Sequence, residues 1–219
     1  MPMHLVSSAV AVLIATLALG SSGSATVIPV SKVFFTGSPV TTFNGLATNT
    51  EVNGLTVDGI LFNYLVGGTP TNGQVIIDDG PGTTNNISVP NVVSIGNHTG
   101  TLLLTLPTTA NALGYGFADL AETTLSDATT ITLFNGNTTV GSLVYSGSPD
   151  PLFTGGFAGI ESTVPFNRVG LNFSASALAF AVDNIVYTTP SAVPEPGTLL
   201  LITTGIGGVL ARRRLFRSV

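Results

Sequence analysis

Carboxylates are the side chains of this chain best suited to chemistry, because it has no cysteine and only two histidines. Asp150, Glu161 and Asp183 could serve as a general acid and base on a glycosidic bond if two of them converged in a cleft within about 5–10 Å. Nothing in their spacing fixes such a distance, and scattered acids form pairs by chance. His98 sits in a turn-like segment, and no Gly-x-Ser-x-Gly elbow is present. We therefore expect no enzyme.

Two adjacent carboxylates, Asp78 and Asp79, precede the residues Gly80-Pro81-Gly82. Neighbouring residues on a strand point to opposite faces, so both could bind one cation only if the backbone bends there. Asp followed by Gly and Pro is also a turn signature. We favour the solvated turn over a cation site at this position.

The composition of residues 26–190 limits the partners that they could have. Lys32 and Arg168 are the only basic residues in this range, against ten acidic ones, which gives a net charge near −8. We expect no nucleic-acid partner, because phosphate binding draws on Lys and Arg. Without cysteine there is no disulfide and no thiolate zinc site. The surface must consist mostly of Thr, Ser, Asn and Gly, which suits an exported protein.

The pattern of residues 26–190 predicts one all-β domain. Short β-branched and aromatic runs alternate with Gly, Pro, Asn and Asp, and no helical period persists. The segments 131–134 and 140–145 flank Asn135-Gly136, which predicts a tight hairpin. Residues 169–173 alternate apolar with small or polar side chains, as in a strand with one buried face. About ten strands would fit, and we expect an antiparallel two-sheet sandwich of jelly-roll type.

The first 25 residues read as a signal peptide. An apolar run from Leu5 to Leu19 precedes a stretch of small residues that suits cleavage after Ala25. The run has no Lys or Arg before it, which departs from the usual pattern. The alternative is a first transmembrane helix.

The C-terminal segment, 191–219, combines three features of an export signal. A Pro-Glu-Pro motif is followed by an apolar helix predicted at 197–211 and then by an arginine cluster. The fourteen mostly apolar residues 198–211 would cover, as a helix, only about 21 Å of a hydrocarbon core roughly 30 Å thick, so the anchor is marginal. The arginines should keep their end cytoplasmic. The residues are Pro194, Glu195 and Pro196, followed by Arg212, Arg213, Arg214 and Arg217.

This order of motif, helix and arginines resembles the PEP-CTERM sorting signal of bacterial surface and exopolysaccharide-associated proteins. The resemblance implies export by the secretion machinery and transient anchoring in the inner membrane. It also implies cleavage near Pro-Glu-Pro by an exosortase, a membrane protease, followed by residence at the cell surface or in the extracellular matrix. The alternative is an ordinary single-span anchor preceded by a chance Pro-Glu-Pro.

A second resemblance covers most of the domain. Residues 42–62 look like the first strands of a jelly-roll domain frequent in PEP-CTERM proteins, and residues 156–187 end like a carbohydrate-binding module. In such modules the residue matching Asp183 helps to hold a structural calcium near the first strand, where Asn44 stands here in place of an acid. The alternative is that Asp183 and Asn184 only turn the last strand through hydrogen bonds to the backbone.

Three functions follow from these patterns, and we rank them. The first is an exported, exosortase-processed protein with a non-catalytic sandwich and no cofactor. The second is a polysaccharide-binding module with a calcium brace, although the chain offers no Trp and few Tyr residues for sugar stacking. The third is a secreted glycoside-active enzyme. The four tyrosines fall mostly on strand patterns, as core or edge residues would: Tyr64, Tyr115, Tyr145 and Tyr187.

Overall fold

The computed structural model describes residues 25–84, 86–150 and 153–190. These segments contain thirteen strands and one short 3-10 helix, where the sequence predicted about ten strands. Four of the strands have only two residues, too few for an alternating pattern to be recognised. The elements are β1 (Val27–Pro29), η1 (Lys32–Phe35), β2 (Val40–Thr41), β3 (Thr50–Glu51), β4 (Thr56–Val57), β5 (Ile60–Val66), β6 (Thr69–Pro70), β7 (Val75–Asp78), β8 (Asn91–Ser94), β9 (Thr101–Asp119), β10 (Leu125–Asn135), β11 (Thr138–Asp150), β12 (Phe153–Phe173) and β13 (Phe180–Thr188).

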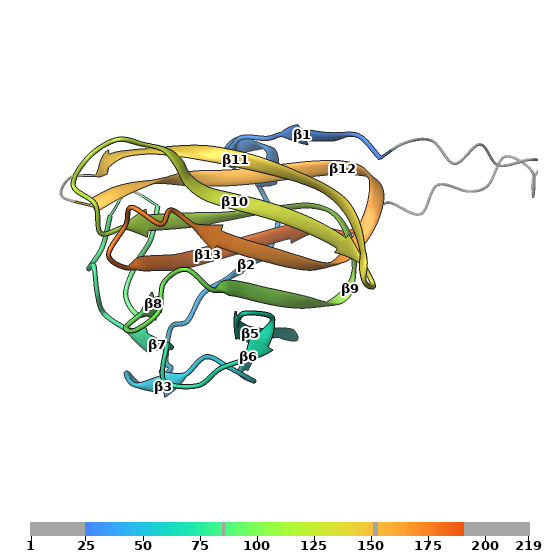
Figure 1. The fold of residues 1–219 in the computed structure, drawn as a ribbon. Helices are drawn as coiled ribbons and strands as arrows, with labels where there is room; N and C mark the ends of the chain where they lie inside the picture. Colours follow the sequence, from blue (N-terminus) through green and yellow to red (C-terminus); the bar gives the residue numbers. More distant parts are fainter. Residues whose placement is uncertain (1–24, 85, 151–152, 191–219) are drawn as a thin grey trace, which may run out of the picture.

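The predicted all-β antiparallel sandwich of jelly-roll type is confirmed, and two long strands build both of its layers. Residues 101–105 of β9 pair with β5 and with the end of β12, next to β10 and β11. Residues 112–119 of β9 pair with β13 and with the start of β12, in the layer that also contains β8, β7 and β3. Figure 1 shows β9 to β13 running alongside one another, with β3, β6 and β7 gathered on one side of them.

The two layers join where the long strands lose their regular pairing. The register of β9 against β12 shifts on both sides of Phe166. Pro107 lies in β9 between its two paired halves, and Pro165 lies beside the shift in β12. Proline has no backbone N–H to donate and therefore occurs at such irregular points rather than in a continuous ladder. The sheet can thus fold over itself without a break in either strand.

The core lies between the layers and is rich in aromatic rings. Phe62, Tyr64 and Phe117 are fully buried. Phe173 and Phe180 stack with their ring centroids 3.9 Å apart and their planes at 10°. These rings come from strands of both layers, so their burial holds the layers together.

The predicted hairpin is confirmed, with its turn one residue later than expected. Asn135 still pairs with Thr138, and the turn consists of Gly136 and Asn137. Only Gly136 takes a positive φ, of 59°. Glycine at the first turn position fits a two-residue hairpin of the II′ kind.

The predicted signal segment before Ala25 and the transmembrane helix predicted at 197–211 lie outside the described residues. Within the described ranges, no helix has the length and apolar character needed to cross a membrane.

Candidate functional site

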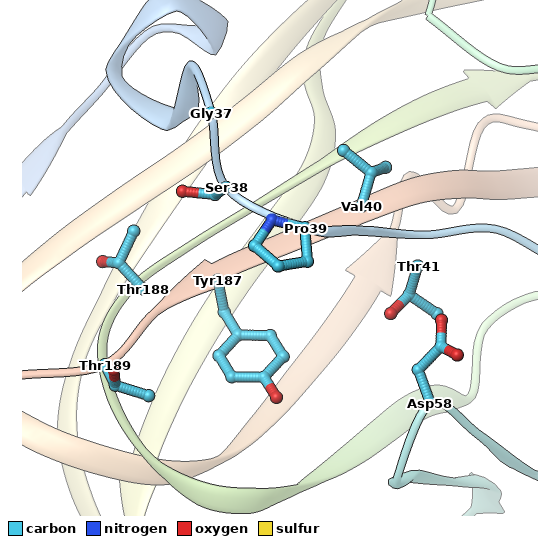
Figure 2. Close-up of a pocket in the computed structure, with 9 residues that line it drawn as sticks. All are labelled: Gly37, Ser38, Pro39, Val40, Thr41, Asp58, Tyr187, Thr188 and Thr189. Atoms are coloured by element: carbon cyan, nitrogen blue, oxygen red, sulfur yellow. The ribbon is translucent and has the colours of Figure 1, made fainter.

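A groove of about 790 Å³ lies between the segment that leads into β2 and the end of β13. The turn between β4 and β5 closes one side of it. The lining residues are Gly37, Ser38, Pro39, Val40, Thr41, Asp58, Tyr187, Thr188 and Thr189. Figure 2 shows the Tyr187 ring in the middle of this set, with Thr41 and Asp58 on one side and Thr188 and Thr189 on the other.

Local backbone geometry places one wall of the groove. Gly37 has a φ of 85°, which turns the chain out of η1, and the Ser38 N–H donates to the Phe35 carbonyl at 3.0 Å. The following residues then pair with β13, with Thr41 opposite Ile185. The wall is therefore fixed at both ends, by a closed turn and by strand pairing.

Asp58 reaches the groove from a tight hairpin turn. The turn between β4 and β5 consists of Asp58 and Gly59, whose φ angles are 50° and 81°. Two positive φ angles are typical of a type I′ turn, for which Asp-Gly is a preferred sequence. Val57-Asp58-Gly59-Ile60 carries this signal in the sequence, but our sequence analysis did not use it. A search for Asp-Gly between apolar residues would have found the hairpin.

The lining chemistry suits an uncharged, hydroxyl-rich ligand. Four hydroxyl side chains and one carboxylate surround a half-buried aromatic ring. Thr188 is held in place because its hydroxyl donates to Asn111 Oδ1 at 2.9 Å. An aromatic body offers apolar contact while its rim offers hydrogen bonds. Asp58 is the only acid among the lining residues, so the groove has no acid and base pair for hydrolysis.

Asp183 and Glu161 do not form the close carboxylate pair that glycosidases use. Asp183 lies opposite Gly116 of β9, whereas Glu161 lies opposite Ala112. Four residues along a strand correspond to roughly 13 Å, which is already longer than the separation that glycosidases use. The third acid, Asp150, is 3.5 Å from the Asn86 amide nitrogen.

The structure places Asp183 under the loop between β7 and β8. Its Oδ2 accepts hydrogen bonds from the Ser88 N–H at 2.9 Å and the Ser88 hydroxyl at 2.6 Å. The residue is fully buried, and its Oδ1 has no partner among the described residues. Burial raises the pKa of this carboxyl, while the Ser88 hydrogen bonds act in the opposite direction. Sequence analysis did not identify Ser88, which is 95 residues away along the chain.

The calcium predicted at Asp183 and Asn44 stays a prediction. Asp183 Oδ1 fits an oxygen-seeking cation, because it is a buried acceptor without a donor. Asn44 is exposed in the turn after β2. Across the part of the chain that the structure describes, no three His, Cys, Asp or Glu side chains gather as a metal site. Any cation here would therefore depend on amide and carbonyl oxygens.

Other predicted positions fall as expected. Asp78 ends β7, and the Gly82 N–H donates to the Asp79 carbonyl at 2.7 Å, so this segment is a turn. Of the four tyrosines, Tyr64 and Tyr115 are buried in the core. Tyr187 is the one that reaches the groove.

Comparison with known proteins identifies the tail. The family model of the PEP-CTERM protein-sorting motif matches residues 192–214. This match confirms the resemblance that Pro194-Glu195-Pro196 and the arginine cluster suggested. The motif covers only the end of the chain and says nothing about residues 26–190. A search of curated proteins found no match.

Solved carbohydrate-binding modules are among the similar structures. A mutant of the family 29 module CBM29-2 complexed with mannohexaose is 9% identical, covers 66% of this chain and 94% of its own, and has a TM-score of 0.36. A family 29 module from Piromyces equi is 13% identical, covers 77% of this chain and 93% of its own, and has a TM-score of 0.35. Similarity at this level carries no argument about the ligand, so the function must be argued from the groove.

Proposed function

We propose that this chain is an exported, exosortase-processed bacterial surface protein whose sandwich domain binds a neutral polysaccharide without cleaving it. The observation that carries the binding proposal is the groove around Tyr187, where an aromatic ring, hydroxyls and one carboxylate meet. The sorting motif at 192–214 supports the export proposal. The two parts are independent and have separate tests.

The sorting motif supports a defined route. The chain would enter the secretion pathway, be held briefly in the inner membrane by the helix predicted at 197–211, and meet an exosortase near Glu195. The arginines beyond that helix would stay cytoplasmic. Cleavage would then leave the sandwich at the cell surface or in the extracellular matrix, where polysaccharide is available.

Charge selects among polysaccharides. The domain has a net charge near −8, and neither Lys32 nor Arg168 lines the groove. An acidic polysaccharide would be repelled by this surface. A neutral glycan avoids that repulsion, because its hydroxyls can donate to Asp58 and exchange hydrogen bonds with threonine hydroxyls. We therefore expect a neutral glycan as the ligand, and not an acidic one.

Affinity electrophoresis of the full chain, in mild detergent, against soluble β-glucan and mannan tests the binding proposal. Tyr187→Ala removes the ring from the groove, and loss of about 2 kcal/mol at a central aromatic contact corresponds to roughly 30-fold weaker retention. Asp58→Asn should also weaken retention, since it removes the charged acceptor. Val144→Ala, at an exposed position on β11, is the matched control and should bind as the wild type does. Wild-type migration unaffected by every neutral glycan, or equal retention of Tyr187→Ala, would contradict the proposal.

The calcium brace at Asp183 is part of the proposal. A cation there would tie β13 to the loop that carries Ser88, and it would act on stability rather than on the groove. We expect Asp183→Asn to leave glycan retention unchanged.

A further inference from the structure

A second carboxylate, far from the groove, is buried without any partner. Asp119, at the end of β9, is fully buried. Neither of its carboxylate oxygens has a hydrogen-bond partner among the described residues. Burying a charge without a partner is costly, and a buried carboxylate normally has donors or an opposite charge beside it.

The backbone around Asp119 prevents its side chain from turning out to solvent. Asp119 pairs with Thr154 of β12 on one side and with Phe180 of β13 on the other. The next residue is also held, because the Leu120 N–H donates to the Ala179 carbonyl at 2.8 Å. Since Phe117 points into the core, Asp119, two residues further along the strand, faces the same way.

The domain has no basic side chain to compensate this carboxylate. Lys32 is exposed on η1, and Arg168 donates to the Gly136 carbonyl at 3.1 Å and to Asn137 Oδ1 at 2.7 Å. The charged group that does act on Asp119 is another acid, Asp127 of β10. Burial, with a smaller effect of Asp127, raises the pKa of Asp119 to about 8.

The loop between β12 and β13 connects the neighbourhood of Asp119 to a second acid. The Leu178 N–H of this loop donates to the Leu120 carbonyl at 2.9 Å, directly beside Asp119. Asp127 is exposed at the surface, and its Oδ1 accepts a hydrogen bond from the Ser174 hydroxyl at 3.3 Å. Asp119 and Asp127 thus lie against the two ends of the same loop, residues 174–179, one of them buried and the other exposed.

We propose that Asp119 and Asp127 bind a divalent cation of the calcium class. The cation supplies the positive charge that the chain itself lacks, and calcium takes its ligands from carboxylates, backbone carbonyls and water. The site joins the end of β9 to the start of β10. The site is separate from the groove and from Asp183. The proposal of a cation here is therefore independent of whether the sandwich binds a glycan.

Thermal unfolding of the full chain in mild detergent, treated with chelator and then titrated with CaCl2, tests the site. At a concentration a hundredfold above its Kd, calcium should raise the unfolding midpoint by roughly 5–10 °C. Asp119→Asn, which keeps the shape and removes the charge, should lose this rise, and Asp127→Asn should reduce it. Asp79→Asn, at an exposed acid in another turn, should keep it. Asp183→Asn shows how much of any calcium effect belongs to the other predicted site.

Two results of that titration would overturn the proposal. One is a wild-type unfolding midpoint that calcium does not move, which would mean that the Asp119 carboxyl is protonated and needs no cation. The other is a rise of unchanged size in Asp119→Asn, which would place the cation elsewhere.

A spectroscopic probe answers the same question without relying on stability. Tb³⁺ binds at calcium sites and emits when a nearby tyrosine absorbs light. Tyr115 lies on the same face of β9 as Asp119, four residues away or roughly 13 Å along the strand. Tyrosine-excited Tb³⁺ emission should be displaced by calcium and lost in Tyr115→Phe, but kept in Tyr187→Phe. Emission that survives Tyr115→Phe at full strength would count against the site.

Discussion

The backbone carbonyl oxygen of Asn86 occupies the space that any side chain at Gly116 would need. An ideal Cβ at this position would lie far inside van der Waals contact with the Asn86 carbonyl group. The same carbonyl oxygen accepts a hydrogen bond from the Asn184 amide at 2.8 Å. The loop between β7 and β8 is therefore pressed onto β9 and β13, and this contact is what buries Asp183.

Gly116→Ala should destabilise the domain by forcing this loop away from the sheet. A clash with backbone cannot be relieved by a change of rotamer, so we expect a loss of about 1–3 kcal/mol in the free energy of unfolding. Denaturant unfolding of the full chain measures it. Gly80→Ala is the matched control, because a Cβ there meets nothing within 4 Å, and it should change stability by less than about 0.5 kcal/mol. Equal stability of the two variants would show that the loop does not rest on Gly116.

Ser88→Ala should weaken the attachment of Asp183 to the same loop. The variant removes the hydroxyl that donates to Asp183 Oδ2 and leaves the Ser88 N–H in place. Hydrogen bonds to charged groups are worth about 1.5–3 kcal/mol, and we expect a loss in this range. Ser88→Thr keeps a hydroxyl and should retain most of the stability. A thermal unfolding midpoint of Ser88→Thr no higher than that of Ser88→Ala would argue against the hydrogen bond.

Tyr145 should make stability depend on pH in the alkaline range. Its hydroxyl donates to the Gly159 carbonyl, and burial raises its pKa to about 12. The unfolded value is about 10, so the folded state keeps the proton more tightly. The resulting stabilisation is fully present below about pH 10 and is lost as the pH rises through about 12.

Tyr145→Phe isolates this effect. The variant cannot ionise at this position, so its stability should fall less steeply than that of the wild type between about pH 10 and 12. Unfolding free energies at several pH values give both slopes. Identical slopes would mean that other groups account for the alkaline loss.

Glu195→Gln should block processing of the tail. Glu195 lies in the centre of the Pro-Glu-Pro motif within the matched sorting signal. In the native host, we expect the variant to stay in the membrane fraction at the mass of the chain with its arginine cluster. Wild-type protein should be recovered outside the cell without it. Ser191→Ala, just before the matched segment, should be processed normally, and normal processing of Glu195→Gln would show that the motif is not what the protease reads.

Local patterns were enough to predict the fold class. The hairpin at Gly136 followed from Asn-Gly between β-branched runs, because turn chemistry acts over a few residues. The strand at residues 169–173 was predicted from its alternating pattern, and its Val169, Leu171 and Phe173 side chains are buried in the core. The two-residue strands were missed because they are too short to show a period. The sorting motif of the C-terminal segment was also predicted correctly, since its residues follow one another along the chain.

The candidate sites could not be predicted in the same way. The groove is lined by Asp58 and Tyr187, which are far apart in the sequence. Its remaining wall, residues 37–41, is placed beside Tyr187 only by the pairing of β2 with β13. Ser88 donates hydrogen bonds to Asp183, which is 95 residues away, and the path of the loop that carries Ser88 has no sequence signature.

The sequence by itself determined that this is an acidic, cysteine-free, all-β domain with a sorting tail, because composition, periodicity and short motifs are local properties. Only the tertiary structure decided which acid is buried without a partner. Asp119 looks like any other strand-end aspartate in the sequence, and its isolation arises from pairing with β12 and β13 on both sides. Burial and charge compensation depend on contacts between distant segments, and these are fixed only when the sandwich closes.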